Sequence, residues 1–339
     1  MRVMELTDWN PEAIRLGQRK KPECGPDEVL LRMQAASLNY RDTVLVRQGY
    51  GRLSGTLPLI PVSDGAGTIE QLGSNVTEFS VGDLVTPFFF QDWPDGPYTN
   101  GVAKSALGGM RDGVMQEYMA VPASLIARAP HHFDALQAST LPCAALTAWN
   151  AVVASGNVGA KDVVVIQGTG GVSLFALQFA HMRGAKTILL SSTDEKLARG
   201  KELGADYLFN YLDEPQWSGL VREITGGVGA SHVVEVGGAK TLDQSIRSVA
   251  AGGTISLIGV LSGLKPELNL GPVVTQNIRL QGITVGSHAM HRAMVAAIDE
   301  SKILPVIDDH IEAFESVGLA IATYGKRSHF GKVCVDFSK

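Results

Sequence analysis

A glycine-rich segment, VVVIQGTGGVS at residues 163–173, carries the clearest chemical signal in the sequence. An apolar run typical of a strand leads into the glycines, and the helical pattern LFALQFAHMRG follows. Glycines here allow a tight turn and let backbone N–H groups approach a pyrophosphate, which the positive end of the helix also attracts. Ser173 replaces a third glycine and is small enough to keep helix and strand close. We therefore predict a dinucleotide site whose loop consists of Gly168, Thr169, Gly170, Gly171, Val172 and Ser173.

Further apolar runs place this loop in a sheet. Strands are predicted at 187–190, 207–210, 232–236 and 254–258, with helical patterns between them, and a sixth strand at 278–285. This alternation predicts an α/β fold with a doubly wound parallel sheet and a ligand crevice at the carboxyl ends of its strands. Glycines also mark ordinary turns, but the strand–turn–helix context favours the dinucleotide interpretation.

The end of the second predicted strand bears on the choice of coenzyme. An acidic residue about twenty positions after the glycine loop would bind the ribose of NAD. Ser191 and Ser192 stand there instead, and Lys196 follows one turn into the next helix. We therefore predict NADP(H) rather than NAD(H). The alternative is that Ser192 caps this helix with Glu195 and that Lys196 belongs to a solvated face.

The residues ahead of this module have a different character. Short apolar runs at 28–35, 67–72, 84–89 and 117–121 are separated by turn sequences, which predicts a compact β-rich domain. A helical pattern at 135–155 would connect this domain to the sheet. After the sheet, a helix is expected at 291–302 and a strand at 332–337, and we expect this tail to return to the first domain.

Composition excludes several classes of partner. The 339 residues include 29 basic and 34 acidic side chains, a net charge of −5, and no basic stripe for nucleic acid or a membrane surface. The segment MRVMELTDWN has no basic n-region and no apolar core, and no uninterrupted apolar run reaches about eighteen residues, so we expect neither export nor membrane insertion. We expect a cytoplasmic protein that binds a small-molecule substrate. Three scattered cysteines indicate no disulfide framework.

Several motifs in order carry a resemblance. They are ASLNYRD near residue 40, the segment 57–85, LPCAALTAW, the glycine loop, LGAD at 203–206 and SHFGKV near the end. Along essentially its whole length the chain resembles the medium-chain dehydrogenase/reductases, in particular their zinc-free quinone oxidoreductase branch. The resemblance implies a GroES-like β-barrel domain (1–143 and 286–339), a Rossmann domain (144–285), a substrate cleft between them, and a homodimer or homotetramer.

The zinc positions of this family are altered. Where alcohol dehydrogenases carry a cysteine, a histidine, a glutamate and a second cysteine, this chain has Asn39, Ser63, Asp64 and Cys143. One thiol cannot make a zinc site, which needs three protein ligands. The cysteines of a structural-zinc lobe are missing between residues 91 and 116. The pairs His131 with His132 and His288 with His291 lack nearby ligands, so we expect surface or hinge positions for them and no metal site.

Without a metal, hydrogen bonds must stabilise the charge that develops during hydride transfer. An enone, enal or quinone spreads this charge onto a conjugated oxygen, where modest donors suffice, so reduction of such compounds by NADPH is the favoured reaction. The resemblance implies Asn39 and Tyr50 as donors, with Tyr40 and Asp42 as second choices. For Asp42, a structural role through Arg41 or backbone N–H groups is the stronger interpretation.

The resemblance also implies further coenzyme contacts. Those near the nicotinamide and its ribose are Thr147, Gly259, Val260, Leu261, Val285 and Ser287. Those at a 2′-phosphate are Lys196, Tyr211 and Arg327. Two other functions stay open: a crystallin-like or redox-sensing NADP-binding protein without turnover, and an alcohol dehydrogenase with reassigned zinc ligands.

Overall fold

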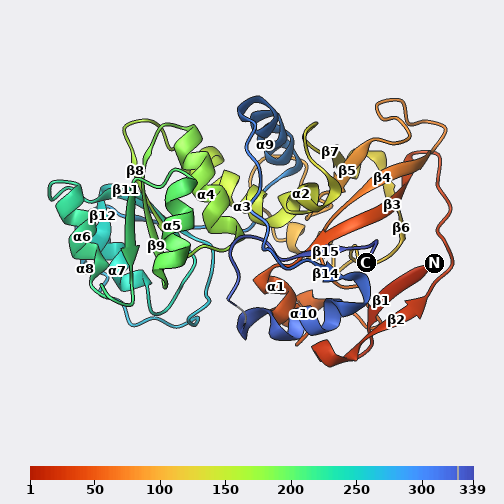
Figure 1. Ribbon diagram of the computed structural model, residues 1–339, viewed down its shortest axis with the longest axis horizontal. Helices are drawn as coiled ribbons and strands as arrows, with labels where there is room; N and C mark the ends of the chain where they lie inside the picture. Colours follow the sequence, from red (N-terminus) through yellow and green to blue (C-terminus); the bar gives the residue numbers. More distant parts are fainter. Residues whose placement is uncertain (327) are drawn as a thin grey trace. The chain divides into compact units, whose positions relative to one another are not determined.

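The computed structural model describes residues 1–326 and 328–339, and it separates into two compact units (Figure 1). Unit 1 comprises Met1–Leu146 and Gly286–Lys339, and unit 2 comprises Thr147–Val285. A core of buried apolar side chains lies within each unit. Among the described helices, none is long and apolar enough to cross a membrane.

Unit 2 is built on a six-stranded parallel sheet with the order β10–β9–β8–β11–β12–β13. Its strands are β8 (Val163–Gln167), β9 (Lys186–Ser191), β10 (Tyr207–Asn210), β11 (Ala230–Glu235), β12 (Val249–Leu257) and β13 (Arg279–Gly282). Its helices are α4 (Gly171–Met182), α5 (Asp194–Glu202), α6 (Trp217–Ile224), α7 (Leu242–Ser248) and α8 (Gly271–Thr275). Helices α4 and α5 lie on one side of the sheet, and α6 and α7 lie on the other (Figure 1).

This strand order confirms the predicted doubly wound sheet. The chain starts in the middle, at β8, moves outward through β9 and β10, and then returns to continue on the other side of β8 with β11. The carboxyl ends of β8 and β11 therefore diverge into different loops, which opens a crevice at this edge of the sheet. Central strands covered on both faces read as continuous apolar runs, which is why β8 and β9 were recognisable from sequence.

The predicted sixth strand, 278–285, is too long. The structure ends β13 at Gly282, and Val285 has a positive φ of 52°. A β-branched residue rarely adopts this left-handed conformation, so surrounding contacts must hold it. The Asn150 amide supplies one such contact, because its Nδ2 donates a hydrogen bond of 2.7 Å to the carbonyl oxygen of Val285.

Unit 1 contains a seven-stranded sheet and a separate hairpin. The path β14–β15–β3–β4–β5–β7 accounts for six strands, β6 pairs with β3, and β1 pairs with β2. The strands are β1 (Arg2–Leu6), β2 (Ile14–Gln18), β3 (Glu28–Ser37), β4 (Asp64–Leu72), β5 (Leu84–Pro87), β6 (Tyr118–Pro122), β7 (Ile126–Arg128), β14 (Glu312–Ala313) and β15 (Cys334–Asp336). Its helices include α1 (Tyr40–Leu45), α2 (Ala135–Ser139), α9 (His288–Ser301) and α10 (Val317–Thr323). Pairing of β15 with β3 confirms that the carboxyl-terminal tail returns to the first domain.

The helical pattern at 135–155 forms a broken helix. Asp134 caps α2 by accepting a hydrogen bond from the Gln137 N–H at 2.8 Å. Wider π-helical turns at Leu141–Ala145 and Asn150–Ala154 then flank the short helix α3 (Leu146–Trp149). Pro142 lies in the first of these turns and has no N–H to donate, which accounts for the loosened winding there.

The expectation of surface or hinge positions is wrong for two histidines of α9. His288 and His291 are 4% and 0% exposed. Phe88 lies between them, stacked on the His288 ring at 4.0 Å between centroids and edge-on to the His291 ring at 5.3 Å. The Nε2 of His291 lies 3.3 Å from the Thr86 hydroxyl, so α9 packs its histidines against the end of β5.

Burial of His291 predicts a loss of stability in acid. Desolvation by burial, together with the neighbouring His288 and Arg292, lowers its pKa to about 3. In the unfolded chain its pKa is about 6.5, so the unfolded state takes up a proton in a pH range where the folded state does not. The contribution of neutral His291 to the free energy of unfolding is therefore fully present above pH 6.5 and is lost as the pH falls toward 3. Between pH 7.5 and 5.0 we expect His291→Gln to lose about 2 kcal/mol less unfolding free energy than the wild type.

Urea unfolding at the two pH values measures this difference. His181→Gln removes an exposed histidine from α4 and serves as the control. Equal pH dependence of wild type and His291→Gln would contradict the argument.

Candidate active site

The glycine loop joins β8 to α4 with geometry suited to an anion. Gly168 has φ +75°, which favours glycine, and a Cβ built on Gly170 would meet nothing within 4 Å. The first N–H groups of α4 have no acceptor within their own helix and add to its positive end. The Ser173 hydroxyl donates to the Gln167 carbonyl oxygen at 2.6 Å and holds α4 close to β8. The loop therefore fits a dinucleotide pyrophosphate.

The end of β9 offers hydroxyl groups and a cation. Ser191 is 2% exposed, whereas Ser192 and Lys196 are partly exposed and Tyr211 is 39% exposed. The Tyr211 N–H donates to the Ser191 carbonyl oxygen at 3.0 Å, which places the start of the next loop beside this strand end. Arg327, the remaining predicted contact, lies outside the described residues.

Thr193, not Ser192, caps α5. The Thr193 hydroxyl accepts a hydrogen bond from the Lys196 N–H at 3.4 Å, so the capping interpretation of Ser192 is wrong. The nearest acid in the helix, Asp194, accepts a hydrogen bond from the Asn210 amide at 3.1 Å. Ser192 thus does not cap α5, and the Asp194 carboxylate has a partner within the protein.

A buried carboxylate anchors the loop after β11. Glu235 is 0% exposed, and its Oε1 accepts hydrogen bonds from the N–H groups of Gly237 and Gly238 at 2.8 and 2.9 Å and from the Thr241 hydroxyl at 2.5 Å. Its Oε2 accepts from the Gln167 amide at 2.7 Å and from the Ser245 hydroxyl. Because Gln167 ends β8, Glu235 ties together the two strands between which the crevice opens.

The loop after β12 is held against the loop after β11. A Cβ on Gly259 would lie 2.2 Å from the Val236 carbonyl oxygen, so only glycine allows this approach. The Ser262 N–H donates to the Gly237 carbonyl oxygen at 2.7 Å. Val260 and Leu261 are 47% and 51% exposed, and they offer apolar surface at the carboxyl edge of the sheet.

The remaining predicted coenzyme residues are buried. Thr147 is 3% exposed at the start of unit 2, and Val285 is 5% exposed at its end. Ser287 belongs to unit 1, where its hydroxyl caps α9 by accepting a hydrogen bond from the Met290 N–H at 3.2 Å.

Unit 1 brings five polar residues together, Asn39, Asp42, Asp64, Cys143 and Lys332, which we call the Asn39 cluster. Asn39 precedes α1 and is 8% exposed. Its N–H donates to Asp42 Oδ2 at 2.8 Å, and its Oδ1 accepts a hydrogen bond from Lys332 Nζ at 2.6 Å. Its Nδ2 is buried and has no hydrogen-bond partner among the described residues. The Asn39 cluster thus contains one buried amide donor that has no acceptor among the described residues.

The carboxyl of Asp42 is buried and contacts Arg41 and the Asn39 N–H. Desolvation by burial raises its pKa to about 6, and the Arg41 guanidinium and the Asn39 N–H oppose this rise. The Arg41 Nη1 lies 3.7 Å from Asp42 Oδ1. A structural role through Arg41 or backbone N–H groups, as predicted, would use these contacts.

Tyr50 and Tyr40 are 44% and 41% exposed. Partial desolvation raises the pKa of Tyr50 above its ordinary value, and the positive charge of Arg41 opposes this rise. The Tyr50 hydroxyl is therefore protonated at neutral pH and lies within electrostatic range of the Asn39 cluster, as a second donor would require.

The zinc-ligand positions do not fit a zinc ion. Asp64 accepts hydrogen bonds from the Ser63 hydroxyl at 2.6 Å and the Cys143 N–H at 3.0 Å, and the Lys332 ammonium lies 4.0 Å from its Oδ2. Burial, together with the charge of Asp64, raises the pKa of the Cys143 thiol, which keeps it protonated. Zinc requires deprotonated ligands and would be repelled by the ammonium. Across the described residues, no three His, Cys, Asp or Glu side chains are placed to hold a metal ion.

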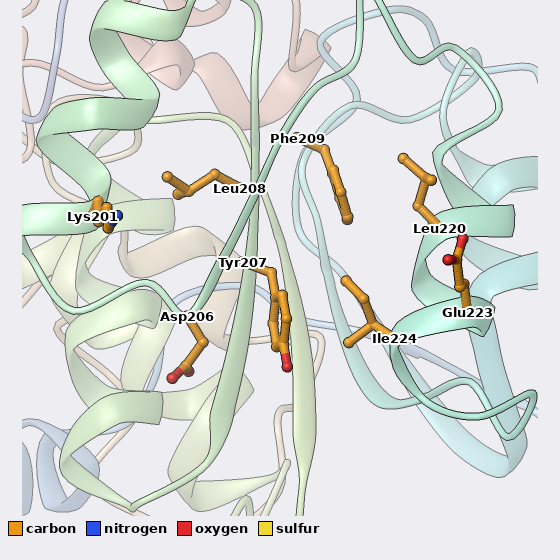
Figure 2. A pocket seen from close by; sticks show the side chains of 8 residues that line it. All are labelled: Lys201, Asp206, Tyr207, Leu208, Phe209, Leu220, Glu223 and Ile224. Atoms are coloured by element: carbon orange, nitrogen blue, oxygen red, sulfur yellow. The ribbon is translucent and has the colours of Figure 1, made fainter.

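A pocket of about 400 Å³ lies elsewhere, beside the edge strand β10 (Figure 2). Phe209 points toward Leu220 and Ile224 of α6, with Lys201 and Glu223 at its margin (Figure 2). None of the predicted site residues lines this pocket, so it is separate from the coenzyme loop.

Sequence reasoning missed three residues of these sites: Gln167, Glu235 and Lys332. The signal for two of them was a charge within an apolar strand pattern, in SHVVEVGG and in FGKVCVDF. Charged residues are rarely fully buried unless they are paired, so such a charge indicates a specific partner. Gln167 carries no comparable signal.

Both parts of the chain match known families. Residues 25–131 match the model for the alcohol dehydrogenase GroES-like domain, and residues 171–300 match the model for zinc-binding dehydrogenases. The predicted combination of a GroES-like domain and a Rossmann domain is thus confirmed.

Whole proteins match as well. A zinc-type alcohol dehydrogenase-like protein of Schizosaccharomyces pombe is 44% identical over 329 residues, which cover 95% of this chain and 93% of the relative. A solved structure from Sinorhizobium meliloti 1021, provisionally assigned as an alcohol dehydrogenase, is 41% identical with a TM-score of 0.91 and coverage of 99% and 98%.

Two further matches differ from each other in the coenzyme that they use. A structure of an NAD-dependent alcohol dehydrogenase is 31% identical, with a TM-score of 0.89 and 99% coverage of both chains. An NADPH-dependent alkenal/one oxidoreductase of Arabidopsis thaliana is 32% identical over 194 residues, 57% of this chain and 47% of the relative.

Proposed function

Because the chain belongs to the medium-chain dehydrogenase/reductase superfamily, in its zinc-type alcohol dehydrogenase-like branch, it is an NAD(P)-dependent oxidoreductase, and we propose that it uses NADPH to reduce quinones, enones or enals without a metal ion. The observation that carries this proposal is the Asn39 cluster. It puts a buried amide donor at one zinc-ligand position and an ammonium beside another.

The proposed reaction assigns separate tasks to the two units. NADPH, when bound, supplies the hydride. The glycine loop and the positive end of α4 hold its pyrophosphate, while Val260 and Leu261 offer apolar contact. Asn39 Nδ2 and the Tyr50 hydroxyl donate hydrogen bonds to the carbonyl oxygen of the substrate as negative charge collects there. A conjugated oxygen develops less concentrated charge than a simple alkoxide, so neutral donors can take the place of a metal.

The preference for NADPH rests on the end of β9. Ser192 has no role as a helix cap, Lys196 is close to it in the chain, and no acidic side chain occupies the position of the strand end. The Arabidopsis relative, which is NADPH-dependent, supports the proposal, although the NAD-dependent structure shows that the fold accepts either coenzyme.

Lys196→Ala tests this preference. Loss of one charge-assisted hydrogen bond to the 2′-phosphate should raise the Kd for NADPH about 10-fold and leave the Kd for NADH unchanged. Lys201→Ala, which removes the same charge from the same helix, is the matched control. Fluorescence titration measures both constants. An equal effect of the two substitutions would contradict a phosphate contact at Lys196.

Turnover tests the reaction itself. The purified protein is dialysed against a strong chelator, its metal content is measured, and NADPH oxidation is followed with quinones, enones, enals and simple ketones. We expect conjugated substrates to be reduced and simple ketones to react slowly, with no loss of rate after chelation. Abolition of turnover by the chelator, or its restoration by zinc, would overturn the proposal.

A further inference from the structure

Lys332 is a buried charged residue to which the proposed reaction assigns no role. Lys332 lies two residues before the start of β15, and it is 1% exposed. Its ammonium donates hydrogen bonds to the Leu38 carbonyl oxygen at 2.8 Å and to Asn39 Oδ1 at 2.6 Å. Its third neighbour is Asp64 Oδ2 at 4.0 Å. Two of its three contacts thus fall on the segment that carries the proposed substrate donor.

These contacts determine which way the Asn39 amide faces. A lysine ammonium has three donors and no acceptor, so only the oxygen of an amide can face it. Oδ1 therefore turns toward Lys332, and Nδ2 turns away. The Asp42 carboxylate accepts a hydrogen bond from the backbone N–H of Asn39. The main chain and the side chain of Asn39 are therefore held by different partners.

The Nδ2 group that remains has no partner among the described residues, although it is buried. Buried donors are normally satisfied, so an unpaired one indicates a missing acceptor. A substrate carbonyl oxygen can accept this hydrogen bond, while a second donor cannot. If the amide were reversed, Oδ1 would face the substrate oxygen and repel it.

We infer that Lys332 is a positioning residue, which holds the Asn39 carboxamide with Nδ2 as the donor and thereby makes the site specific for a substrate oxygen that accepts a hydrogen bond. This inference rests on the proposed function and adds the residue that orients its donor. Lys332 itself does not touch the substrate. It acts only through Asn39.

Removal of Lys332 alone would leave the buried Asp64 carboxylate without its neighbouring ammonium, so the comparison is made in an Asp64→Asn background. There, Lys332→Gln retains an amide donor for Asn39 Oδ1, and Lys332→Met of similar size has none. We expect the Met variant to have a kcat for enone reduction at least 10-fold below that of the Gln variant. The Kd for NADPH and the melting temperature should agree between the two.

Asn39→Ala then distinguishes an effect on the orientation of the Asn39 carboxamide from any other effect of the substitutions at position 332. When Asn39→Ala is added to both variants, the difference in kcat between Gln and Met at position 332 should disappear. A difference that persists without Asn39, or equal kcat values in its presence, would overturn the inference.

A spectroscopic measurement keeps the test independent of turnover. In protein labelled with ¹⁵N-asparagine, the side-chain amide signals of Asn39 are those missing from Asn39→Ala. They should shift with Met at position 332 and stay near their wild-type position with Gln. Unshifted signals with Met would refute the positioning role. If the wild type reduced no conjugated substrate, the proposed function would fail, while these signals would still decide the role of Lys332.

Discussion

Replacing Asn39 with alanine is expected to lower kcat for enone or quinone reduction by about 10²- to 10³-fold, the usual effect of removing one preorganised donor from a developing oxyanion. The Asn39 amide is 8% exposed, its oxygen is taken by Lys332, and its Nδ2 is unpaired among the described residues. It therefore needs no reorganisation when charge develops. Single-turnover kinetics with saturating NADPH measure the chemical step directly.

The coenzyme loop belongs to unit 2, so the Kd for NADPH should be unchanged in Asn39→Ala. Asn75→Ala is the matched control. It truncates an exposed asparagine of unit 1 whose Nδ2 donates to Asp27 at 2.8 Å, and it should keep the wild-type rate. If Asn39→Ala reacted within about threefold of this control, its contribution would be below about 0.7 kcal/mol and the amide could not be a substantial oxyanion donor.

The parallel sheet was predictable because its central strands have a simple pattern. Val164, Val165 and Ile166 are all 0% exposed, so nearly every residue of β8 had to be apolar. The edge strand β13 lacks this constraint, and its predicted end overran to 285. The left-handed Val285 depends on a contact with Asn150, 135 residues away in the chain, which no local pattern reveals.

The β-rich unit was predicted less completely. The longer strands β3 and β4 were recognised from apolar runs, whereas the hairpin of β1 and β2 was not. β2 has exposed residues at Arg15, Leu16 and Gln18 and so lacks a clear alternation. A strand that is open to solvent on much of its length carries too little of the period-2 pattern to be found.

The residues of the candidate site also differ in how far local sequence predicts them. The glycine loop was visible because its geometry restricts residue type locally, at Gly168 through a positive φ and at Gly259 through the contact with Val236. Asn39 was found only through the family resemblance. Its orientation depends on Lys332, which joins it from 293 residues away, and such long-range pairing is absent from any single stretch of sequence.

Replacing Glu235 with glutamine should affect stability and coenzyme binding together. The carboxylate accepts five hydrogen bonds, whereas a glutamine amide would set its own NH₂ against several of the same donors. Buried donors left unpaired are costly, so we expect a loss of about 3 kcal/mol in unfolding free energy. The Glu235 carboxylate holds the loop at 236–241, and the Ser262 N–H in the loop after β12 donates to the Gly237 carbonyl oxygen of that loop. We therefore expect the Kd for NADPH to rise as well, by about 10-fold.

Glu223→Gln makes the same chemical change at an exposed position of α6 and should alter neither quantity. The two effects of Glu235→Gln are separable by temperature, since a purely global destabilisation leaves the Kd unchanged wherever the variant is fully folded. A raised Kd at 10 °C, measured on protein with native circular dichroism, would therefore show that the loops had moved. Wild-type affinity under these conditions would restrict Glu235 to a role in stability and assign the position of the loops to their backbone contacts, such as the one between Ser262 and Gly237.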